Sequence, residues 1–288
     1  MTPVDGATLA YLSVTLAELS ITRSHPLWPA VACFHVFVTA AVFWSCQASS
    51  KAPSWGRDWY PLLLLPLLYF EIPLFNETFL SFARDSAVMR LEGVVFPFQP
   101  ARTLARAWPW RPLSEALHLA YLSYYPLIYG PLLLLYFKGR RDAFRETMFV
   151  VMLTYYVCYL VFVFFPVRGP WDLWPVSDTP PNGFFRSLAV QILQKGSSMG
   201  AAFPSSHMAV AVAQTMCAMR HSRRIALLAG ALSVGIAVGA VYASFHNGID
   251  MIAGGLLGAA VVLGTRKILA SVGSIGPAYR GTIVHTGR

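Results

Sequence analysis

The sequence predicts an all-α protein, a polytopic bundle of helices within a membrane. Of its 288 residues, 56% are hydrophobic and only 12% are charged, whereas a typical water-soluble domain has about 25% charged residues. The apolar residues also occur in blocks, such as 112–137 and 225–245. Each block is close to the roughly 20 residues that a helix needs to cross a bilayer. A single water-soluble core is therefore excluded.

The apolar blocks also predict the order of the helices. Residues 7–22 are moderately apolar, short and interrupted by Glu18, so they form either an interfacial helix or a weak span. Clearer spans are predicted at 26–46, 60–80, 112–137, 146–166, 204–219, 225–245 and 250–269. We divide the chain into N-terminal helices with a cytoplasmic linker (1–58), a membrane domain (59–270) and a cytoplasmic tail that we expect to be disordered (271–288).

Basic clusters between the spans predict the orientation. They are Lys138 with Arg140, Arg141 and Arg145; Arg220 with Arg223 and Arg224; and Arg266 with Lys267. Counting spans places these clusters on one side, which the positive-inside bias makes cytoplasmic. Loop 166–203 and the turn at 246–250 then face the non-cytoplasmic side. Segment 81–111 shares that side although it is rich in arginine, and we expect an interfacial or re-entrant segment, or a lip that attracts phosphate.

The net charge of +9 does not indicate nucleic-acid binding. The basic residues lie between apolar blocks, and no patch interleaves the aromatic and basic side chains that bind single-stranded nucleic acid. The cysteines form no CxxC pair of the kind found in zinc ribbons; they are Cys33, Cys46, Cys158 and Cys217. We expect the thiols of these cysteines to be inert and buried.

Glycines recur at four-residue spacing in the last two predicted spans. Gly235 and Gly239 lie in one span, and Gly254 and Gly258 lie in the other. Small residues at this spacing let membrane helices approach closely. We therefore expect these two spans to pack on each other and to hold the turn between them in a fixed geometry.

Chemically active side chains occur in two short stretches on the predicted non-cytoplasmic side. In the first, Pro204 suits the first position of a helix, which places Ser205, Ser206 and His207 in the first turn. The unpaired amides and the dipole at a helix N-terminus form a phosphate site. In the second stretch, His246 and Asp250 are four residues apart and meet if the turn is helical. A carboxylate on one imidazole nitrogen fixes the tautomer and leaves the other nitrogen free to attack.

These stretches resemble the type 2 phosphatidic acid phosphatase superfamily. The resemblance rests on Phe203-Pro-Ser-Ser-His207 and Val241-Tyr-Ala-Ser-Phe-His246-x3-Asp250, with similar features upstream in Ser114-Glu115-Ala-Leu-His118, Ser123-Tyr-Tyr125 and Phe165-Pro-Val-Arg-Gly-Pro170. The most similar branch is that of the inositol phosphorylceramide synthases and related bacterial proteins. The resemblance covers residues 60–270, which makes the membrane domain the catalytic domain. It implies a six-helix core, to which the span 26–46 is an addition.

The resemblance also implies a role for each site residue. His246 attacks phosphorus and becomes a phosphohistidine, Asp250 orients it, and His207 protonates the leaving oxygen. The residues implied to bind phosphate are Ser205, Ser206 and Arg168. Possible substrate contacts are Gly169, Tyr125 and Glu115. The implied partners are a membrane phospholipid donor and a lipid hydroxyl or water acceptor, with no cofactor and no metal.

Two departures from the family pattern favour transfer over hydrolysis. Phosphatases of the superfamily have a lysine where this chain has Val161 and an arginine where it has Ala240. A phosphomonoester carries nearly two negative charges and a phosphodiester one, so a site with fewer cations suits the diester. This pattern is similar to that of the sphingolipid synthases. We therefore predict a lipid phosphotransferase, with a phosphatase acting on phosphatidic acid-like or polyprenyl phosphate lipids as the alternative.

Two further interpretations remain open. His207, His246 and Asp250 would provide three protein ligands for zinc, with water as the fourth. Glu71, inside an apolar span, favours a non-enzymatic lipid transporter, because buried ionisable residues mark pathways or relays. The hydropathy pattern shows neither the inverted repeat nor the paired broken helices typical of transporters.

Overall fold

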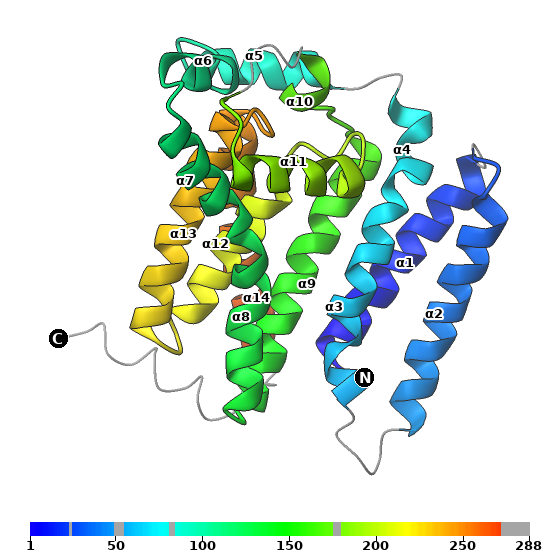
Figure 1. Cartoon of the computed structure of the whole chain (residues 1–288). Coiled ribbons are helices and arrows are strands. Elements are labelled where there is room, and N and C mark those ends of the chain that lie inside the picture. The colour runs from blue at the N-terminus through cyan, green and yellow to red at the C-terminus, as the bar shows by residue number, and fades with distance from the viewer. Residues whose placement is uncertain (23–24, 49–54, 81–83, 175–179, 272–288) are drawn as a thin grey trace.

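Helices form the regular structure of the chain (Figure 1). The computed structural model describes residues 1–22, 25–48, 55–80, 84–174 and 180–271. Within these residues no strand forms, and only Val167 and Ala201 make an isolated parallel bridge. The predicted all-α bundle is therefore confirmed. Residues 272–288 of the predicted tail, and residues 49–54 of the predicted linker, lie outside the described residues.

The order of the helices follows the blocks of the sequence. The helices are α1 (Pro3–Thr22), α2 (Trp28–Ala48), α3 (Trp55–Phe70), α4 (Ile72–Leu80), α5 (Asp85–Val95), α6 (Pro100–Ala107), α7 (Arg111–Leu122), α8 (Tyr124–Phe137), α9 (Arg141–Phe164), α10 (Pro170–Leu173), α11 (Phe184–Gly196), α12 (Ser206–Ala218), α13 (Arg223–Tyr242) and α14 (Gly248–Ser271). Ser123 joins α7 to α8, and Glu71 joins α3 to α4.

Six helical stretches among the described residues are long and apolar enough to cross a membrane. They are Pro3–Ile21, Trp28–Gln47, Arg111–Phe137, Arg141–Phe164, Arg223–Tyr242 and Gly248–Arg266. They support an integral, multi-pass membrane protein. Two predicted spans take a different form: 60–80 is divided at Glu71 into α3 and α4, and 204–219 contains only the 13-residue α12. α12 begins late because Ser205 keeps an extended backbone and caps the helix.

The glycine pairs pack against other helices than expected. A Cβ atom on Gly239 would lie 2.3 Å from the carbonyl oxygen of Leu117 in α7. A Cβ atom on Gly258 would lie 2.1 Å from the carbonyl oxygen of Ala209 in α12. The expectation that these glycines join the last two spans to each other is therefore wrong. Four-residue spacing identifies a helix face that allows close approach, but it does not identify the partner helix.

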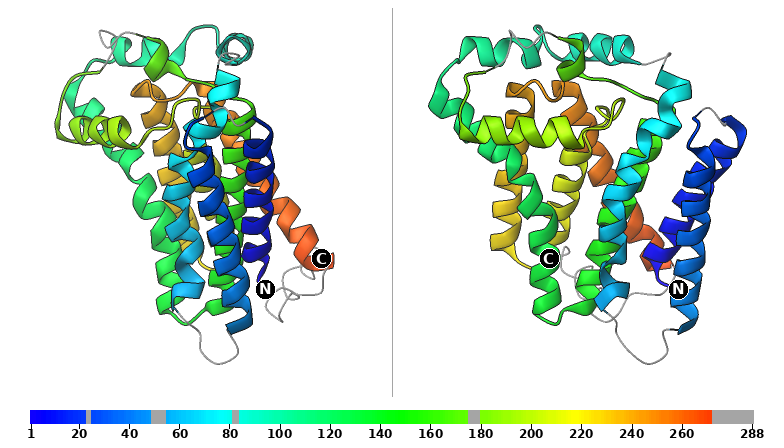
Figure 2. Two further views of the ribbon diagram at one scale, coloured as in Figure 1. Left: turned by 90° about the vertical axis from the view of Figure 1, so that its right-hand side faces the viewer. Right: turned by 45° about the vertical axis from the view of Figure 1, so that its right-hand side comes forward.

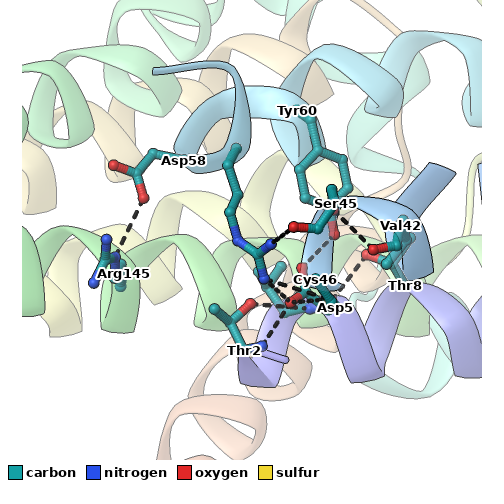
Figure 3. A network of polar contacts seen from close by, with 11 residues as sticks. Thr2, Asp5, Thr8, Val42, Ser45, Cys46, Asp58, Tyr60 and Arg145 are labelled. Carbon is teal, nitrogen blue, oxygen red and sulfur yellow. Dashed lines mark hydrogen bonds and ion pairs between the residues drawn. The ribbon is translucent and has the colours of Figure 1, made fainter. Parts of the chain in front are cut away.

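Polar contacts join the N-terminal helices to one another and to α9 (Figure 3). The hydroxyl of Tyr60 donates to Asp5 Oδ1 at 2.8 Å, and Arg57 Nη2 donates to Asp5 Oδ2 at 3.1 Å. Arg145 Nε on α9 donates to Asp58 Oδ1 on α3 at 3.2 Å. These contacts fix the ends of α1, α3 and α9 beside one another.

One face of α1 buries polar side chains along the length of the helix. Its buried polar positions are Asp5, Thr8, Tyr11, Thr15 and Glu18. Thr8 Oγ1 lies 2.9 Å from the hydroxyl of Tyr156 on α9, and Thr15 Oγ1 lies 3.4 Å from His35 Nδ1 on α2. The other nitrogen of His35 lies 2.9 Å from Glu71 Oε2. Glu71, the residue that favoured a transporter, thus has a histidine partner inside the N-terminal part of the bundle.

The connecting segments gather at two ends of the bundle (Figures 1 and 2). At one end Arg140 lies 3.4 Å from His221, which links the α8–α9 turn to the α12–α13 turn. At the other end α5 and α6 lie across the bundle, and α11 crosses it below them. Segment 81–111, predicted to be interfacial, supplies both α5 and α6. The predicted site residues lie at this second end, in segments that α5 and α11 cover.

Candidate active site

The segment before α12 is held by backbone hydrogen bonds to two neighbouring segments. The amide of Ala202 donates to the carbonyl of Val167 at 3.0 Å, and the amide of Ser205 donates to the carbonyl of Asp250 at 3.0 Å. Ser205 then caps α12, and its Oγ accepts from the amide of Met208 at 3.4 Å. The start of α12 is thereby fixed against the start of α14.

His246 has different partners on its two ring nitrogens. Its Nδ1 lies 3.0 Å from the carbonyl oxygen of Ala202 and 3.6 Å from Asp250 Oδ2. Because a carbonyl oxygen can only accept, Nδ1 carries the proton. In the neutral ring Nε2 is then the acceptor nitrogen, and it lies 3.5 Å from Ser205 Oγ. The geometry therefore places this ring nitrogen beside the residue that caps α12.

Asp250 organises the turn that carries His246. Its Oδ2 accepts from the amide of Asn247 at 2.7 Å and from Asn247 Nδ2 at 3.3 Å. Its Oδ1 is buried, with no hydrogen-bond partner among the described residues. Asp250 thus holds the turn that carries His246, and it also lies close to His246 Nδ1.

His207 lies beside His246, as the resemblance implied. The two imidazole rings are 5.7 Å apart between centroids, and both histidines come from the covered end of the bundle. Ser205 and Ser206, which directly precede His207 in the chain, are buried. The structure thus brings together Ser205, His207, His246 and Asp250, the central residues of the predicted site.

Two tyrosines of the α7–α8 junction complete the surroundings of His207. The hydroxyl of Tyr121 lies 3.2 Å from His207 Nε2, and the Tyr124 ring is 4.1 Å from the His207 ring between centroids. His207 Nδ1 is buried without a hydrogen-bond partner in the described part of the chain. Neither tyrosine was among the predicted site residues, although the Ser123-Tyr-Tyr125 stretch was noted.

Glu92 of α5 is a further residue that sequence reasoning missed. Its Oε1 accepts from the amide of Gly248 at 3.0 Å, and its Oε2 accepts from the amide of Ile249 at 2.7 Å. A Cβ atom on Gly248 would lie 2.7 Å from the Phe96 ring, so the turn lies tightly under α5. Glu92 therefore clamps the turn between His246 and Asp250.

The pKa of Glu92 is raised above its ordinary value. Burial is the main cause and the nearby Asp250 charge adds to it, whereas the Ile249 and Gly248 amides oppose it. A carboxyl whose pKa is higher in the folded than in the unfolded state favours folding most when it is protonated. The contribution of Glu92 to stability therefore decreases as the pH rises from its ordinary pKa through the raised one.

Arg168 and Gly169 lie at the rim of the site, where Asp85 holds them. Asp85 Oδ1 accepts from the amides of Arg168 and Gly169 at 2.9 and 3.2 Å, and Asp85 Oδ2 accepts from Arg168 Nε at 3.2 Å. Gly169 has φ +81°, and a Cβ atom there would lie 2.7 Å from Ala202 Cβ. Glycine is therefore required both for the backbone conformation and for the close approach.

The remaining predicted contacts lie around this centre. Glu115 of α7 accepts from the amides of Phe185 and Arg186 at 2.9 and 3.2 Å, so it caps α11. Tyr125 is partly exposed, and its ring is 5.6 Å from that of Tyr124. Among the described residues, no group of three or more His, Cys, Asp or Glu side chains is arranged to hold a metal ion, which gives the zinc interpretation no support.

A comparison with protein families identifies the superfamily to which this arrangement belongs. The family model described as the PAP2 superfamily matches residues 86–264, more than half of the chain. The chain belongs to the PAP2 superfamily. Membership supports phosphatase or phosphotransferase chemistry at a membrane, and the match includes both histidine stretches. No curated protein and no solved structure matches the chain.

Proposed function

We propose that this PAP2 superfamily protein is a membrane lipid phosphotransferase. It moves a phosphate-linked head group from one lipid to the hydroxyl of another, through a phosphohistidine on His246. The observation that carries the proposal is that the two ring nitrogens of His246 have different partners. Its Nδ1 is bound by the carbonyl of Ala202, and its Nε2 lies 3.5 Å from Ser205, so one nitrogen is available for attack.

The proposed reaction has two steps. In the first, His246 Nε2 forms a bond to phosphorus, the bond from phosphorus to the leaving lipid oxygen breaks, and His207 donates a proton to that oxygen. In the second, His207 accepts the proton of the acceptor hydroxyl as its oxygen bonds to phosphorus, and the bond to His246 breaks. Asp250 and the Ala202 carbonyl stabilise the charge that His246 gains when it attacks.

The charges around the site support transfer to a lipid rather than hydrolysis of a phosphomonoester. Ala240 is fully buried and Val161 is partly buried, so neither position offers the cation found in superfamily phosphatases. Arg168 shares its charge with Asp85. A phosphodiester, with its single charge, is the better match. The inositol phosphorylceramide synthase-like branch, inferred from the sequence, agrees with this substrate class.

We further propose that the site opens to the non-cytoplasmic side. The α8–α9 and α12–α13 turns, which are basic, lie at the opposite end of the bundle from the α13–α14 turn, the segment that contains His246 (Figure 1). Positively charged loops are retained in the cytoplasm, so the histidines face the periplasm or a lumen.

The test is a reconstituted assay with a phospholipid labelled at phosphorus, with and without ceramide or diacylglycerol. Label that moves to the added lipid supports transfer. Free phosphate as the only labelled product contradicts transfer and supports the alternative, a lipid phosphate phosphatase. No turnover of any phospholipid, with the protein shown to be folded, contradicts both.

Glu92→Ala should lower kcat about tenfold or more, because the two amides of the turn that carries His246 lose their acceptor, at about 1–3 kcal/mol for each buried amide. Glu92→Gln keeps one acceptor oxygen, so its kcat should lie between those of the wild type and the alanine variant. Both would be measured in the same assay, with circular dichroism as the folding control. Wild-type kcat in Glu92→Ala would exclude this positioning role.

A further inference from the structure

The phosphate site lacks a fully available cation among the residues so far assigned to it. Arg168 is the only predicted cation, and its Nε already pairs with Asp85 at 3.2 Å. Even a phosphodiester carries one full negative charge, which is costly to bury without a partner. A second cation is therefore expected close to the two histidines.

The helix α11 places an arginine toward this region. α11 crosses the covered end of the bundle (Figure 1) and packs on α7. Its inward face carries residues at helical spacing, namely Arg186, Ala189, Val190 and Leu193. Ala189 is fully buried in the cluster that contains Tyr121 and Phe245, the neighbours of His207 and His246. Arg186 is the charged member of a face that is otherwise apolar.

Arg186 is a buried residue, and its guanidinium has no carboxylate partner among the described residues. The residue is only 8% exposed. Its one side-chain hydrogen bond within the described part of the chain goes to the amide oxygen of Asn182. No described carboxylate forms an ion pair with it, and burial lowers its pKa. Buried charges in proteins are normally paired or bound to a ligand.

The helix that carries Arg186 packs on α7, and Tyr121 of α7 contacts His207. The His118 ring of α7 is 6.0 Å from that of Phe245, the residue before His246. Glu115 fixes the first turn of α11 by accepting from the amides of Phe185 and Arg186. A Cβ atom on Gly183 would lie 2.1 Å from Glu115 Oε1, so α11 begins in close contact with α7.

We propose that Arg186 binds the phosphate of the lipid substrate and takes the place of the cations that Val161 and Ala240 remove. This inference rests on the proposed phosphotransferase function and names the group that recognises the substrate. Arg186 belongs to α11, whereas Val161 and Ala240 belong to α9 and α13. The proposed cation therefore comes from a different helix than the cations it replaces. The bond to Asn182 uses one N–H of Nη1, so Nε and Nη2 keep their N–H donors for phosphate oxygens, which suits bidentate binding.

The test compares Arg186→Gln, Arg186→Lys and the control Arg224→Gln, which removes an exposed arginine at the opposite end of the bundle. Arg186→Gln should raise KM for the labelled phospholipid about tenfold or more and weaken competition by inorganic phosphate to a similar extent. Arg186→Lys should recover part of the affinity for the phospholipid and part of the competition by phosphate. Lysine keeps the positive charge but lacks the planar guanidinium. Arg224→Gln should match the wild type.

A thermal-shift titration with inorganic phosphate provides a readout that does not require turnover. Phosphate should stabilise the wild type and His246→Ala but not Arg186→Gln. Unchanged KM and unchanged phosphate stabilisation in Arg186→Gln would overturn the inference. A lower melting temperature with an undiminished phosphate effect would also overturn it, because it would indicate a structural role alone. Failure of the wild type to process any phospholipid would instead count against the proposed function, and the titration would still test Arg186.

Discussion

Replacement of His246 by alanine is expected to lower phospholipid turnover about a thousandfold or more, because it removes the nitrogen that forms the covalent intermediate. The polar contacts of its ring among the described residues are with Ser205, Ala202 and Asp250, and Asp250 keeps its bonds to Asn247 without them. The fold should therefore persist. Steady-state assays with a phospholipid labelled at phosphorus measure the effect.

The intermediate itself can be trapped by rapid denaturation. The wild type should retain label in an acid-labile, alkali-stable form that is typical of phosphohistidine, and His246→Ala should retain none. His221→Ala, which alters a histidine at the opposite end of the bundle, is the matched control and should behave as the wild type. Label retained in His246→Ala and lost in His207→Ala would assign the nucleophile to His207 instead.

Replacement of Gly258 by valine is expected to lower the free energy of unfolding by about 3 kcal/mol or more. The first atom of any side chain there would lie 2.1 Å from the carbonyl oxygen of Ala209. Neither backbone can move without separating α14 from α12, the pair of helices that carries Asp250 and His207. Activity should therefore fall together with stability. Unfolding in mixed detergent micelles, followed by circular dichroism, measures the change.

Gly264→Val provides the control on the same helix. A Cβ atom at Gly264 has no atom within 4 Å, so only the small difference in helix propensity between glycine and valine applies, a few tenths of a kcal/mol. Equal losses of stability in the two variants would contradict close packing between α12 and α14. A loss of stability in Gly258→Val alone would support close packing of Gly258 on Ala209.

The fold was predictable because its signals are local. Apolar blocks of the right length identify α9, α13 and α14 without knowledge of their neighbours. The sequence missed the division at Glu71 and the short α12, because both depend on how neighbouring segments hold the backbone. The helix on which Gly239 packs also depends on tertiary arrangement, so the predicted partner was wrong.

The candidate site was predictable to the extent that its residues share short stretches of sequence. His246 and Asp250 are one turn apart, and Ser205 lies two residues before His207. Glu92, Tyr121 and Arg186 escaped because each reaches the site from a separate helix. An isolated glutamate or arginine between apolar blocks gives no sign of which turn it will contact. Only the folded chain places Tyr121 beside His207 and Glu92 beside the turn that follows His246.

The polar face of α1 has a consequence for how the protein is made. Thr8 of α1 meets Tyr156 of α9, which is 148 residues further along the chain. At about 5–20 residues per second, translation takes about 7–30 seconds to reach Tyr156. During that time, the buried hydroxyls and carboxylates of α1 face lipid or the translocation machinery without all their final partners. α1 therefore completes its packing only after α9 has entered the membrane. The packing of the N-terminal helix thus depends on the insertion of a helix in the middle of the chain.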